Sequence, residues 1–587
     1  MPRFIVCLLL LPAAALAQVS TATLTGILTD ASQARLPGVT LTLTNDDTGV
    51  ATTAAANEQG EYTFPLVQPG RYRLTAEAPG FQAVTRTGIV LELGRTTRLD
   101  LTLQLGQLAQ SIEVTGAAPL LESETSTAGQ FIENKTIVDM PLNGRRVGEL
   151  LGLVGGAVFV TGDVIRPRVT LAGGRADQQQ WLLDGVNASN IALEAPQALF
   201  NPPVEAVQEI RVLENNYSAE FGNTSGGVVT MTTRSGTNRF TATVYEYLRN
   251  DKLDARNFFA ADRPPLRWNV FGVVAGGPVI RNRTFFFSHI EWQRQRVGVT
   301  RLITVPTELE RRGDFSRTLT ASGALVPIYD PDTSRPDPAN PARTIRTQFP
   351  GNLIPASRLD PVGAKLAALY AVPNRPPTNL AGANNFVKNA TSALNITTWT
   401  SKVDHQLGRS DRLSGRFVLH DFPTYVTSVF DEPAADPNAS INERRAYSLL
   451  VNEAHSFTPT IINDFRFNWQ PRYFRNISLG LDQGWPAKLG LKGVSERAFP
   501  RVAPAGYAAM GPAQQLRIQT PINDTHIVNM ISILRGAHAF KLGGEARLAR
   551  NVDDLNTFTS GMLAFAVQPT AQPGVNNTGN AIASLLV

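Results

Sequence analysis

The sequence has almost no cysteine: the only one, Cys7, lies in a short apolar segment near the N-terminus. It lacks the small preceding residues of a lipid-modified cysteine, so we expect no lipid anchor there. If this segment is removed on secretion, the mature chain carries no thiol. Disulfide bonds and cysteine-ligated metals are then excluded, although the compartment would permit disulfides.

Long apolar runs are also missing. No stretch of the mature sequence comes near the roughly 18 uninterrupted apolar residues that mark a membrane-spanning helix. A helical membrane protein is therefore excluded. A membrane β-barrel is not, because its strands alternate in polarity and leave only a faint hydropathy signal.

Charge is sparse as well. Charged residues make up 18% of the chain and the net charge is +5 over 587 residues, with arginines scattered among acids. A nucleic-acid-binding protein normally shows a clustered basic face. We therefore expect no nucleic acid among the partners.

Catalytic motifs are missing too. The sequence has no Gly-x-Ser-x-Gly elbow, no phosphate-binding Gly-x-x-x-x-Gly-Lys loop and no His-Glu-x-x-His zinc motif. Six histidines fall on expected strands without metal-ligand spacing, and we expect them to face a lumen or an interface: His289, His405, His420, His455, His526 and His538. We predict a protein that is not an enzyme and needs no cofactor or metal. A secreted peptidase or glycosidase is the least favoured class.

The N-terminus has the features of a secretory signal. Arg3 precedes the apolar run Phe4–Leu11, and the small-residue site Ala15-Leu16-Ala17 follows. A positive start, a short apolar core and an Ala-x-Ala site are typical of a cleavable signal peptide. We predict a signal peptide over residues 1–17 and a mature chain beginning at Gln18.

Residues 18–105 show short β-branched runs separated by turn residues, which predict a small β-sandwich. Pro37-Gly38, Pro69-Gly70 and Pro79-Gly80 suit turns that need a preset φ followed by a positive one. The expected strands are Ala22–Leu28, Thr40–Leu43, Tyr62–Leu66, Tyr72–Ala76 and Leu99–Leu103, with Tyr62, Phe64, Tyr72 and Phe81 as aromatic core.

The same segment resembles the carboxypeptidase regulatory-like, transthyretin-like domain. The resemblance implies a structural or recognition module without an active site. It is carried by Gly26–Asp30, Leu36-Pro37-Gly38-Val39, Gly60-Glu61-Tyr62-Thr63-Phe64, Leu66, Pro69-Gly70-Arg71-Tyr72 and Pro79-Gly80-Phe81.

Residues 106–236 have a mixed α/β texture with Gly-rich stretches. Their motifs resemble the plug domain of TonB-dependent receptors, in particular the Oar-like branch, which carries the same sandwich in front. The motif residues are Asn143, Gly144, Arg145 and Arg146; Asp184 and Gly185; Glu220, Phe221 and Gly222; and Gly226 and Gly227.

The resemblance suggests roles for these motifs. Asp184 and the arginines could form ion pairs that lock the plug inside a polar lumen, and we expect Arg145 and Arg146 to face carboxylates of the barrel wall. An ordinary tight turn is the alternative for Asp184-Gly185. Both interpretations can hold. The Gly222–Gly227 stretch is explained by flexible turn chemistry at the plug–barrel junction.

A short segment between sandwich and plug is a candidate TonB box: Ile112, Glu113, Val114 and Thr115. In the family that the chain resembles, such a segment adds as a strand to the periplasmic TonB protein, with backbone hydrogen bonds supplying affinity. The alternative is that these residues end the sandwich or begin the plug. The sequence leaves both open.

From residue 237 to residue 587 the pattern becomes one of long strands with two distinct faces. Phe465, Phe467 and Trp469 share one face, and Asp464, Arg466 and Asn468 share the other. Two further strands alternate similarly: Phe540, Leu542, Ala546 and Leu548 oppose Lys541, Glu545 and Arg547, and Leu413, Phe417 and Leu419 oppose Arg412, Ser414 and Arg416. A lipid-facing barrel strand needs apolar residues outside and polar residues inside.

Connection lengths favour a barrel over a soluble sandwich. Brief turns at 280–283, 407–411, 457–460 and 535–538 alternate with long segments at 250–267, 297–395, 421–444 and 479–522. Short periplasmic turns opposite long extracellular loops are typical of outer-membrane barrels. Loops of this length are uncommon in compact soluble domains.

Together these features predict a mainly β fold: an N-terminal sandwich, an α/β plug and an incomplete antiparallel transmembrane β-barrel. Only about ten strands are recognisable after the plug by the alternation rule, so we interpret the chain as a fragment. The predicted function is TonB-dependent transport of an extracellular ligand across the outer membrane of a Gram-negative-type bacterium, with TonB and outer-membrane lipid as partners. An Oar-type protein-export channel and a surface adhesion or signalling barrel are the alternatives.

Overall fold

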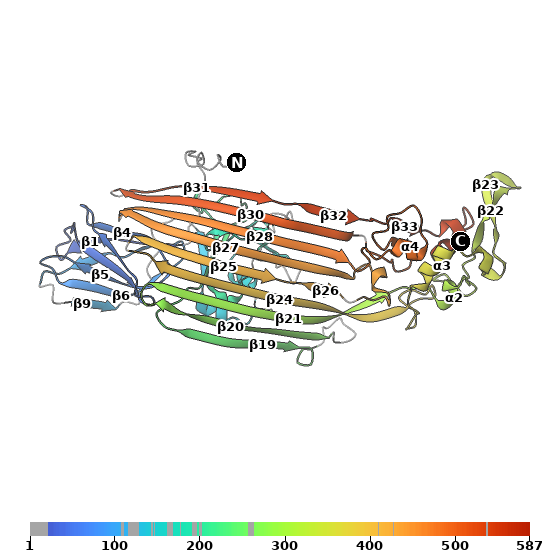
Figure 1. Cartoon of the computed structure of the whole chain (residues 1–587), viewed down its shortest axis with the longest axis horizontal. Coiled ribbons are helices and arrows are strands. Elements are labelled where there is room, and N and C mark those ends of the chain that lie inside the picture. Colours follow the sequence, from blue (N-terminus) through green and yellow to red (C-terminus); the bar gives the residue numbers. More distant parts are fainter. Residues whose placement is uncertain are drawn as a thin grey trace, which may run out of the picture.

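The computed structural model describes residues 21–106, 111–115, 128–142, 145, 147–160, 168–175, 178–190, 197–198, 202–222, 224–255, 263, 265–408, 410–426, 428–458, 460–512, 514–535 and 538–587. The predicted signal peptide, residues 1–17, and Asn143, Gly144 and Arg146 lie outside the described residues. Figure 1 shows three regions in a row: a sandwich at one end, a long curved sheet with the plug beside it, and a smaller module at the far end.

The sandwich consists of two sheets, ordered β4-β1-β7, with β8 also paired to β1, and β3-β2-β5-β6-β9. Its strands are β1 (Ala22–Asp30), β2 (Thr40–Asn45), β3 (Ala51–Ala55), β4 (Glu61–Val67), β5 (Gly70–Glu77), β6 (Ala83–Leu91), β7 (Thr96–Arg98), β8 (Leu101–Leu103) and β9 (Ser111–Thr115). Alternate residues of β1 and β4 are buried, as period-two strands over one core require. The five strands expected from the sequence are confirmed, the fifth only over Leu101–Leu103, and β3, β6, β7 and β9 are additional.

The sandwich core contains the aromatic residues that the sequence indicated. Tyr62, Phe64 and Tyr72 are buried, and Phe81 packs partly buried against them. The glycine of the Pro37-Gly38 turn has φ +72°, a conformation that glycine adopts without strain. The buried hydroxyl of Tyr62 donates to the Leu99 carbonyl at 2.5 Å, which satisfies its polar end.

The plug is built on a separate five-stranded sheet of order β10-β17-β18-β13-β14. Its elements are β10 (Ala128–Glu133), α1 (Asn134–Asp139), η1 (Val147–Leu153), β11 (Val158–Val160), β12 (Arg168–Thr170), β13 (Gln180–Leu183), β14 (Val186–Asn187), β15 (Ser189–Asn190), β16 (Gln197–Ala198), η2 (Val204–Ala206), β17 (Val207–Asn215) and β18 (Val228–Thr233). The plug core around Ile210 and Met231 extends onto Val418 and Ala446 of the long sheet. The plug therefore packs against that sheet without sharing strands with it.

The long sheet, here called the wall, is an 11-stranded antiparallel sheet in the described part of the chain. Its strands are β19 (Thr241–Asn250), β20 (Leu266–Ile280), β21 (Thr284–Ile303), β24 (Phe386–Gln406), β25 (Asp411–Asp421), β26 (Thr424–Val426), β27 (Ser440–Thr458), β28 (Ile461–Ser478), β30 (Gln514–Arg535), β31 (His538–Arg550) and β32 (Asp553–Thr557). Among the described residues, no pairing joins the edge strands β19 and β31. The wall is open in this structure.

The predicted faces of the wall are confirmed on β28. Phe465 and Trp469 are exposed on the convex side, at 37% and 41% of their surface. Asp464, Arg466 and Asn468 are buried on the opposite side, which faces the plug. Polar residues therefore line the lumen and aromatic residues cover the outside, as lipid contact demands.

The predicted alternation of short and long connections is also confirmed. The turns after β20, β24, β27 and β30 are short and lie at the sandwich end. The long connections lie at the other end, but they are more than loops. They carry the elements α2 (Glu308–Arg311), β22 (Tyr329–Asp337), β23 (Asn340–Gln348), η3 (Pro350–Asn352), η4 (Ala356–Arg358), α3 (Pro361–Ala368), η5 (Pro433–Ala435), α4 (Trp485–Leu489), β29 (Arg501–Pro504), β33 (Met562–Phe565), η6 (Gln568–Thr570) and α5 (Ala581–Leu586).

These elements form one module, here called the distal module, from segments 304–385, 428–439, 479–512 and 558–587. A continuous apolar core joins the segments through residues such as Phe315, Tyr370, Phe430, Phe499 and Ile582. Within the described residues, no helix combines the length and the apolar character needed to cross a bilayer.

Candidate functional site at the plug–wall interface

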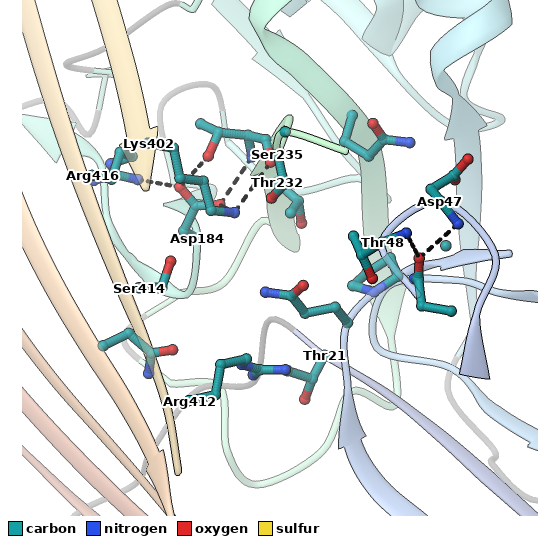
Figure 2. Close-up of a pocket in the computed structure, with 18 of the residues that line it drawn as sticks. Thr21, Asp47, Thr48, Asp184, Thr232, Ser235, Lys402, Arg412, Ser414 and Arg416 are labelled. Atoms are coloured by element: carbon teal, nitrogen blue, oxygen red, sulfur yellow. Dashed lines mark hydrogen bonds and ion pairs between the residues drawn. The ribbon is translucent and has the colours of Figure 1, made fainter. Parts of the chain in front are cut away.

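Asp184 occupies a tight turn between β13 and β14 of the plug. Both turn residues have positive φ, +51° at Asp184 and +75° at Gly185, as a two-residue hairpin of this type requires. The turn presents the Asp184 carboxylate to the wall, where it accepts from Arg416 Nη1 at 2.8 Å (Figure 2). Thr233 also donates to it, through its backbone N–H at 2.9 Å and its hydroxyl at 2.8 Å. Both interpretations of Asp184-Gly185 are therefore realised: a tight turn and an ion pair with the wall.

This ion pair is deeply buried. The side chain of Arg416 is 1% exposed and that of Asp184 is 10% exposed. Burial alone would raise the pKa of Asp184, but the Lys402 ammonium and the Arg416 guanidinium outweigh it and hold the pKa below its ordinary value. The carboxylate therefore stays charged, and the wall cations compensate it.

The same plug hairpin makes further polar contacts with the wall through its backbone. Arg416 Nη1 donates to the Leu183 carbonyl at 2.9 Å. On β28, Arg466 donates to the carbonyl of Gly185 at 3.3 Å, and Gln470 donates to that of Asn187 at 2.8 Å. Three inward-facing wall side chains thus hold one edge of the plug sheet.

Arg145 lies on another side of the plug and differs from the expectation. It forms an ion pair with Glu205, which belongs to the plug itself, and not with a wall carboxylate. The wall contributes the ring of Tyr247, 3.8 Å from the guanidinium carbon. The direct partner of Arg145 is therefore an acid of the plug, which the sequence did not predict, while its charge also acts on the Glu291 carboxylate of the wall, as expected.

Within the part of the chain that the structure describes, two groups of side chains have metal-binding chemistry. Glu205, His289 and Glu291 are buried with donor atoms within 4.8 Å of one another, and Asp411, Glu453 and His455 form a similar, more exposed group. In the first group Arg145 already neutralises Glu205. The Tyr245 hydroxyl bridges the other two residues, at 2.7 Å from His289 Nε2 and from Glu291 Oε2. These contacts explain the group as a neutral polar network between plug and wall.

Of the remaining plug motifs, Glu220 lies near the β31 edge of the wall. Glu220 forms an ion pair with Lys541 of β31 at 2.8 Å. Phe221 packs edge-on against Tyr217. The backbones at Gly174 and Gly226 lie very close together. A Cβ atom added to Gly174 would be only 2.7 Å from the Cα atom of Gly226. Gly227 has φ +86°. Gly222 is described, but no contact of it supports a role.

The candidate TonB box, residues 112–115, lies in β9 at the end of the second sandwich sheet. β9 pairs in parallel with β6, with Val84 opposite Ile112 and Arg86 opposite Val114. Only the backbone of this segment is described. Its position agrees with the alternative that these residues end the sandwich, and it leaves them as an edge strand.

The sandwich contacts both plug and wall at the end of the barrel. Arg211 of β17 donates to the Leu93 carbonyl of the sandwich at 2.9 Å. Asn238, just before β19, donates its backbone N–H to the Asp47 carbonyl at 2.9 Å. Leu66 packs against wall residues, including Ile462 and Met530. The sandwich is therefore docked at this mouth of the barrel.

Two protein families match the chain. Residues 23–104 match the family described as carboxypeptidase regulatory-like domain. Residues 232–587, more than half of the chain, match the family described as outer membrane beta barrel domain. The chain belongs to the outer membrane β-barrel family. This membership places the protein in the outer membrane of a Gram-negative bacterium.

Among curated proteins, the chain is similar to the TonB-dependent transporter Oar of Myxococcus xanthus, with 27% identity over 293 residues. The match covers 48% of this chain and 27% of the relative, so the chain spans only about a quarter of that protein's length. The expected resemblance to the Oar-like branch is confirmed.

The chain is also similar to solved structures, among them a transporter and a receptor. One is the transporter YddB from Escherichia coli, with TM-score 0.46, 10% identity and coverage of 76% of this chain and 51% of that one. The other is the siderophore receptor PirA from Acinetobacter baumannii, with TM-score 0.40, 10% identity and coverage of 71% and 47%.

In this outer membrane β-barrel protein, the sequence identified Asp184 but missed its partners. The sequence predicts Arg416 on the inward face of its strand, and the structure confirms this position. Its pairing with Asp184, more than 200 positions away, has no local signal. The Arg145–Glu205 pair was missed for the same reason. An inward-facing arginine on a barrel strand is itself a usable signal, because such a cation needs a partner in the lumen.

Proposed function

We propose that this outer membrane β-barrel protein is a TonB-dependent receptor that binds an extracellular ligand and moves it across the outer membrane. The observation that carries the proposal is a separately folded plug held in the lumen by polar contacts. The Asp184–Arg416 pair and the hydrogen bonds of Arg466 and Gln470 join two bodies that share no strand. Such contacts can be exchanged for water without breaking the sheet of the wall.

The proposal assigns a role to each region. Residues 1–17 are the signal peptide, residues 18–105 the carboxypeptidase regulatory-like sandwich, residues 106–236 the plug, and residues 237–587 barrel. The plug motifs are Asn143, Gly144, Arg145, Arg146, Glu220, Phe221, Gly222, Gly226 and Gly227, and of these Arg145 and Glu220 contact the wall through Tyr247 and Lys541. The named activity of the Oar relative, a TonB-dependent transporter, supports this division.

Energy would enter through TonB and its inner-membrane complex. The proposed contact is strand addition at Ile112, Glu113, Val114 and Thr115. β9 is the last strand of its sheet, so one edge of its backbone is not paired with any described strand. An incoming extended segment can pair with such an edge through main-chain hydrogen bonds.

A proline substitution tests the contact. Val114→Pro removes one backbone donor from the edge strand. Val114→Ala keeps that donor and serves as the matched control. We expect the periplasmic domain of TonB to bind the unaltered full-length receptor and the alanine variant equally, and the proline variant at least about tenfold more weakly, in line with losing hydrogen bonds of a paired strand. Biolayer interferometry with immobilised receptor measures this.

Equal binding by all three forms would place the TonB contact elsewhere in the chain. Binding by none of them, with the receptor folded, would contradict energisation by TonB itself. An Oar-type export channel shares the plug and the TonB contact and differs in the direction of transport.

A surface adhesion or signalling barrel is the second candidate. The observation that favours it is the distal module, whose long segments share one apolar core instead of forming open loops. A folded module with its own apolar core is suited to the recognition of a macromolecule. A plug that stays fixed to the wall when TonB is energised would favour this candidate over transport.

A further inference from the structure

A cavity of about 120 Å³ lies where the sandwich, the plug and the wall meet. Figure 2 shows Thr21 of the sandwich on one side, Thr232 of the plug on another, and Lys402 and Arg412 of the wall. Each of the three regions contributes polar side chains. A ligand in this cavity would therefore touch all three.

Arg412 is a cation without a partner in this cavity. It lies on β25, two residues before Ser414, on the inward face that also carries Arg416. Its guanidinium forms no ion pair or hydrogen bond with any residue in the described part of the chain, and its Nε is buried without an acceptor. A partly buried guanidinium with five donors is stable only when acceptors surround it.

Lys402 supplies a second, weakly bound cation. Its side chain is 8% exposed, and its ammonium lies 3.3 Å from the Thr233 carbonyl and 3.9 Å from the Asp184 carboxylate. Asp184 is held more closely by Arg416, at 2.8 Å. An ammonium offers three donors, so Lys402 retains capacity for a further acceptor.

Two buried hydroxyls in the cavity also lack partners. Thr21 is 5% exposed and Thr232 is 7% exposed, and neither Oγ1 has a hydrogen-bond partner. Thr21 comes from the edge of the sandwich and Thr232 from β18 of the plug. Unsatisfied buried polar atoms of this kind call for a ligand or ordered water.

The residues that line the cavity carry one more cation than anion, and next to the lining the buried Asp404 carboxylate accepts from Ser414 and Gln68. Lys402, Arg412 and Arg416 line it, against Asp184 and the exposed Asp47. A group with several acceptor oxygens and negative charge would satisfy the Arg412 guanidinium and the Thr21 hydroxyl, which Figure 2 shows side by side at one end of the cavity. A cavity of about 120 Å³ leaves room for one small anion.

We propose that this cavity binds a small oxyanion of the phosphate type at the end where Arg412 and the hydroxyl of Thr21 lie beside each other, with Lys402 and Thr232 as the polar lining of the other end. Because Thr21 belongs to the sandwich and Arg412 to the wall, the bound anion links the two regions. It strengthens docking of the sandwich at the mouth of the barrel. The inference concerns the junction alone and does not depend on transport, cargo or TonB.

Titration with inorganic phosphate tests the proposal on the full-length receptor in detergent. Sodium chloride is exchanged for sodium phosphate at constant ionic strength, and binding is measured by isothermal titration calorimetry. We expect saturable binding of one phosphate per receptor. Arg412→Gln should weaken it at least about tenfold, since a charge-assisted contact is lost. Arg475 is 54% exposed and lies at the end of β28 next to the distal module, so Arg475→Gln should leave phosphate binding unchanged.

A second variant tests the same site independently, in case Arg412→Gln does not fold. Thr21→Val keeps the shape of the side chain and removes its hydroxyl, so it should weaken phosphate binding several-fold. Hydrogen exchange should show phosphate-dependent protection of β1 in the unaltered receptor and none in Arg412→Gln. No saturable binding to the unaltered receptor, or equal binding by Arg412→Gln and Arg475→Gln, would overturn the proposal. A non-saturable effect matched by chloride would mean an adventitious ion only.

Discussion

At the scale of single residues, the inward face of the wall is governed by compensation of buried charge. Arg416 and Arg466 have side chains that are only 1% exposed. Isolated charges in such places would be strongly unfavourable, so each needs a close acceptor. Asp184 supplies it for Arg416 and Asp464 for Arg466. The plug thus supplies part of the negative charge that stabilises the buried cations of the wall.

Replacing Arg416 tests this dependence. Arg416→Met leaves Asp184 with Lys402, 3.9 Å away, as its nearest cation and should lower the free energy of unfolding by about 3–5 kcal/mol, as for other broken buried pairs. Arg475→Met removes an exposed pair with Glu443 and should cost no more than about 1 kcal/mol. Guanidinium unfolding followed by tryptophan fluorescence compares the two.

The double variant Asp184→Asn with Arg416→Met completes the cycle. It should be less destabilised than the sum of the two single variants, because no charge is left unpaired. Additive losses would show that the two residues stabilise the protein independently of each other.

At the scale of the elements, the sequence predicted those strands whose side chains alternate in polarity with period two. The strands of the wall and the faces of Phe465 and Arg466 could be read from the sequence because alternation with period two is a local property. The strand β3 escaped notice because Ala51–Ala55 contains no large apolar residue. The helices and strands of the distal module escaped because its core joins segments far apart in the chain. The partners of Asp184 and Arg145 are likewise set by tertiary structure alone.

The sandwich should fold without the rest of the protein. Its core, including Leu24, Leu43, Tyr62 and Leu74, lies within residues 22–103. We expect a recombinant segment of residues 18–106 to unfold cooperatively in urea, followed by circular dichroism. A segment extended to Thr115 should be more stable, because β9 adds a strand to β6. A non-cooperative transition in both would contradict an independent domain.

At the scale of the whole molecule, the sandwich and the plug meet at a contact that responds to pH. Glu209 on β17 is 5% exposed. Burial, with the nearby negative charge of Glu92, raises the pKa of Glu209 to about 8. The adjacent Arg211 donates to the Leu93 carbonyl of the sandwich. Protonation of Glu209 therefore favours the docked arrangement.

The sign of the pH effect follows from this raised pKa. The stabilisation is fully present below the ordinary pKa of 4.5 and is lost as the pH rises towards about 8. Hydrogen exchange in the turn around Leu93 should therefore be slower at pH 5 than at pH 8 after correction for intrinsic rates. Glu209→Gln should remove this difference and keep the turn protected at pH 8. Glu58→Gln, at an exposed sandwich turn, should leave it intact.

The distal module has a consequence for assembly in the membrane. Its core is shared by segments that leave the wall at β21, β26, β28 and β32, so it can close only after those strands are aligned. A slip of one residue would turn the polar face of a strand outward and shift its segment away from the others. The module therefore stabilises the correct strand register, because only that register buries residues such as Phe315 and Phe499. In a misaligned barrel the same apolar surface would stay exposed at the far end.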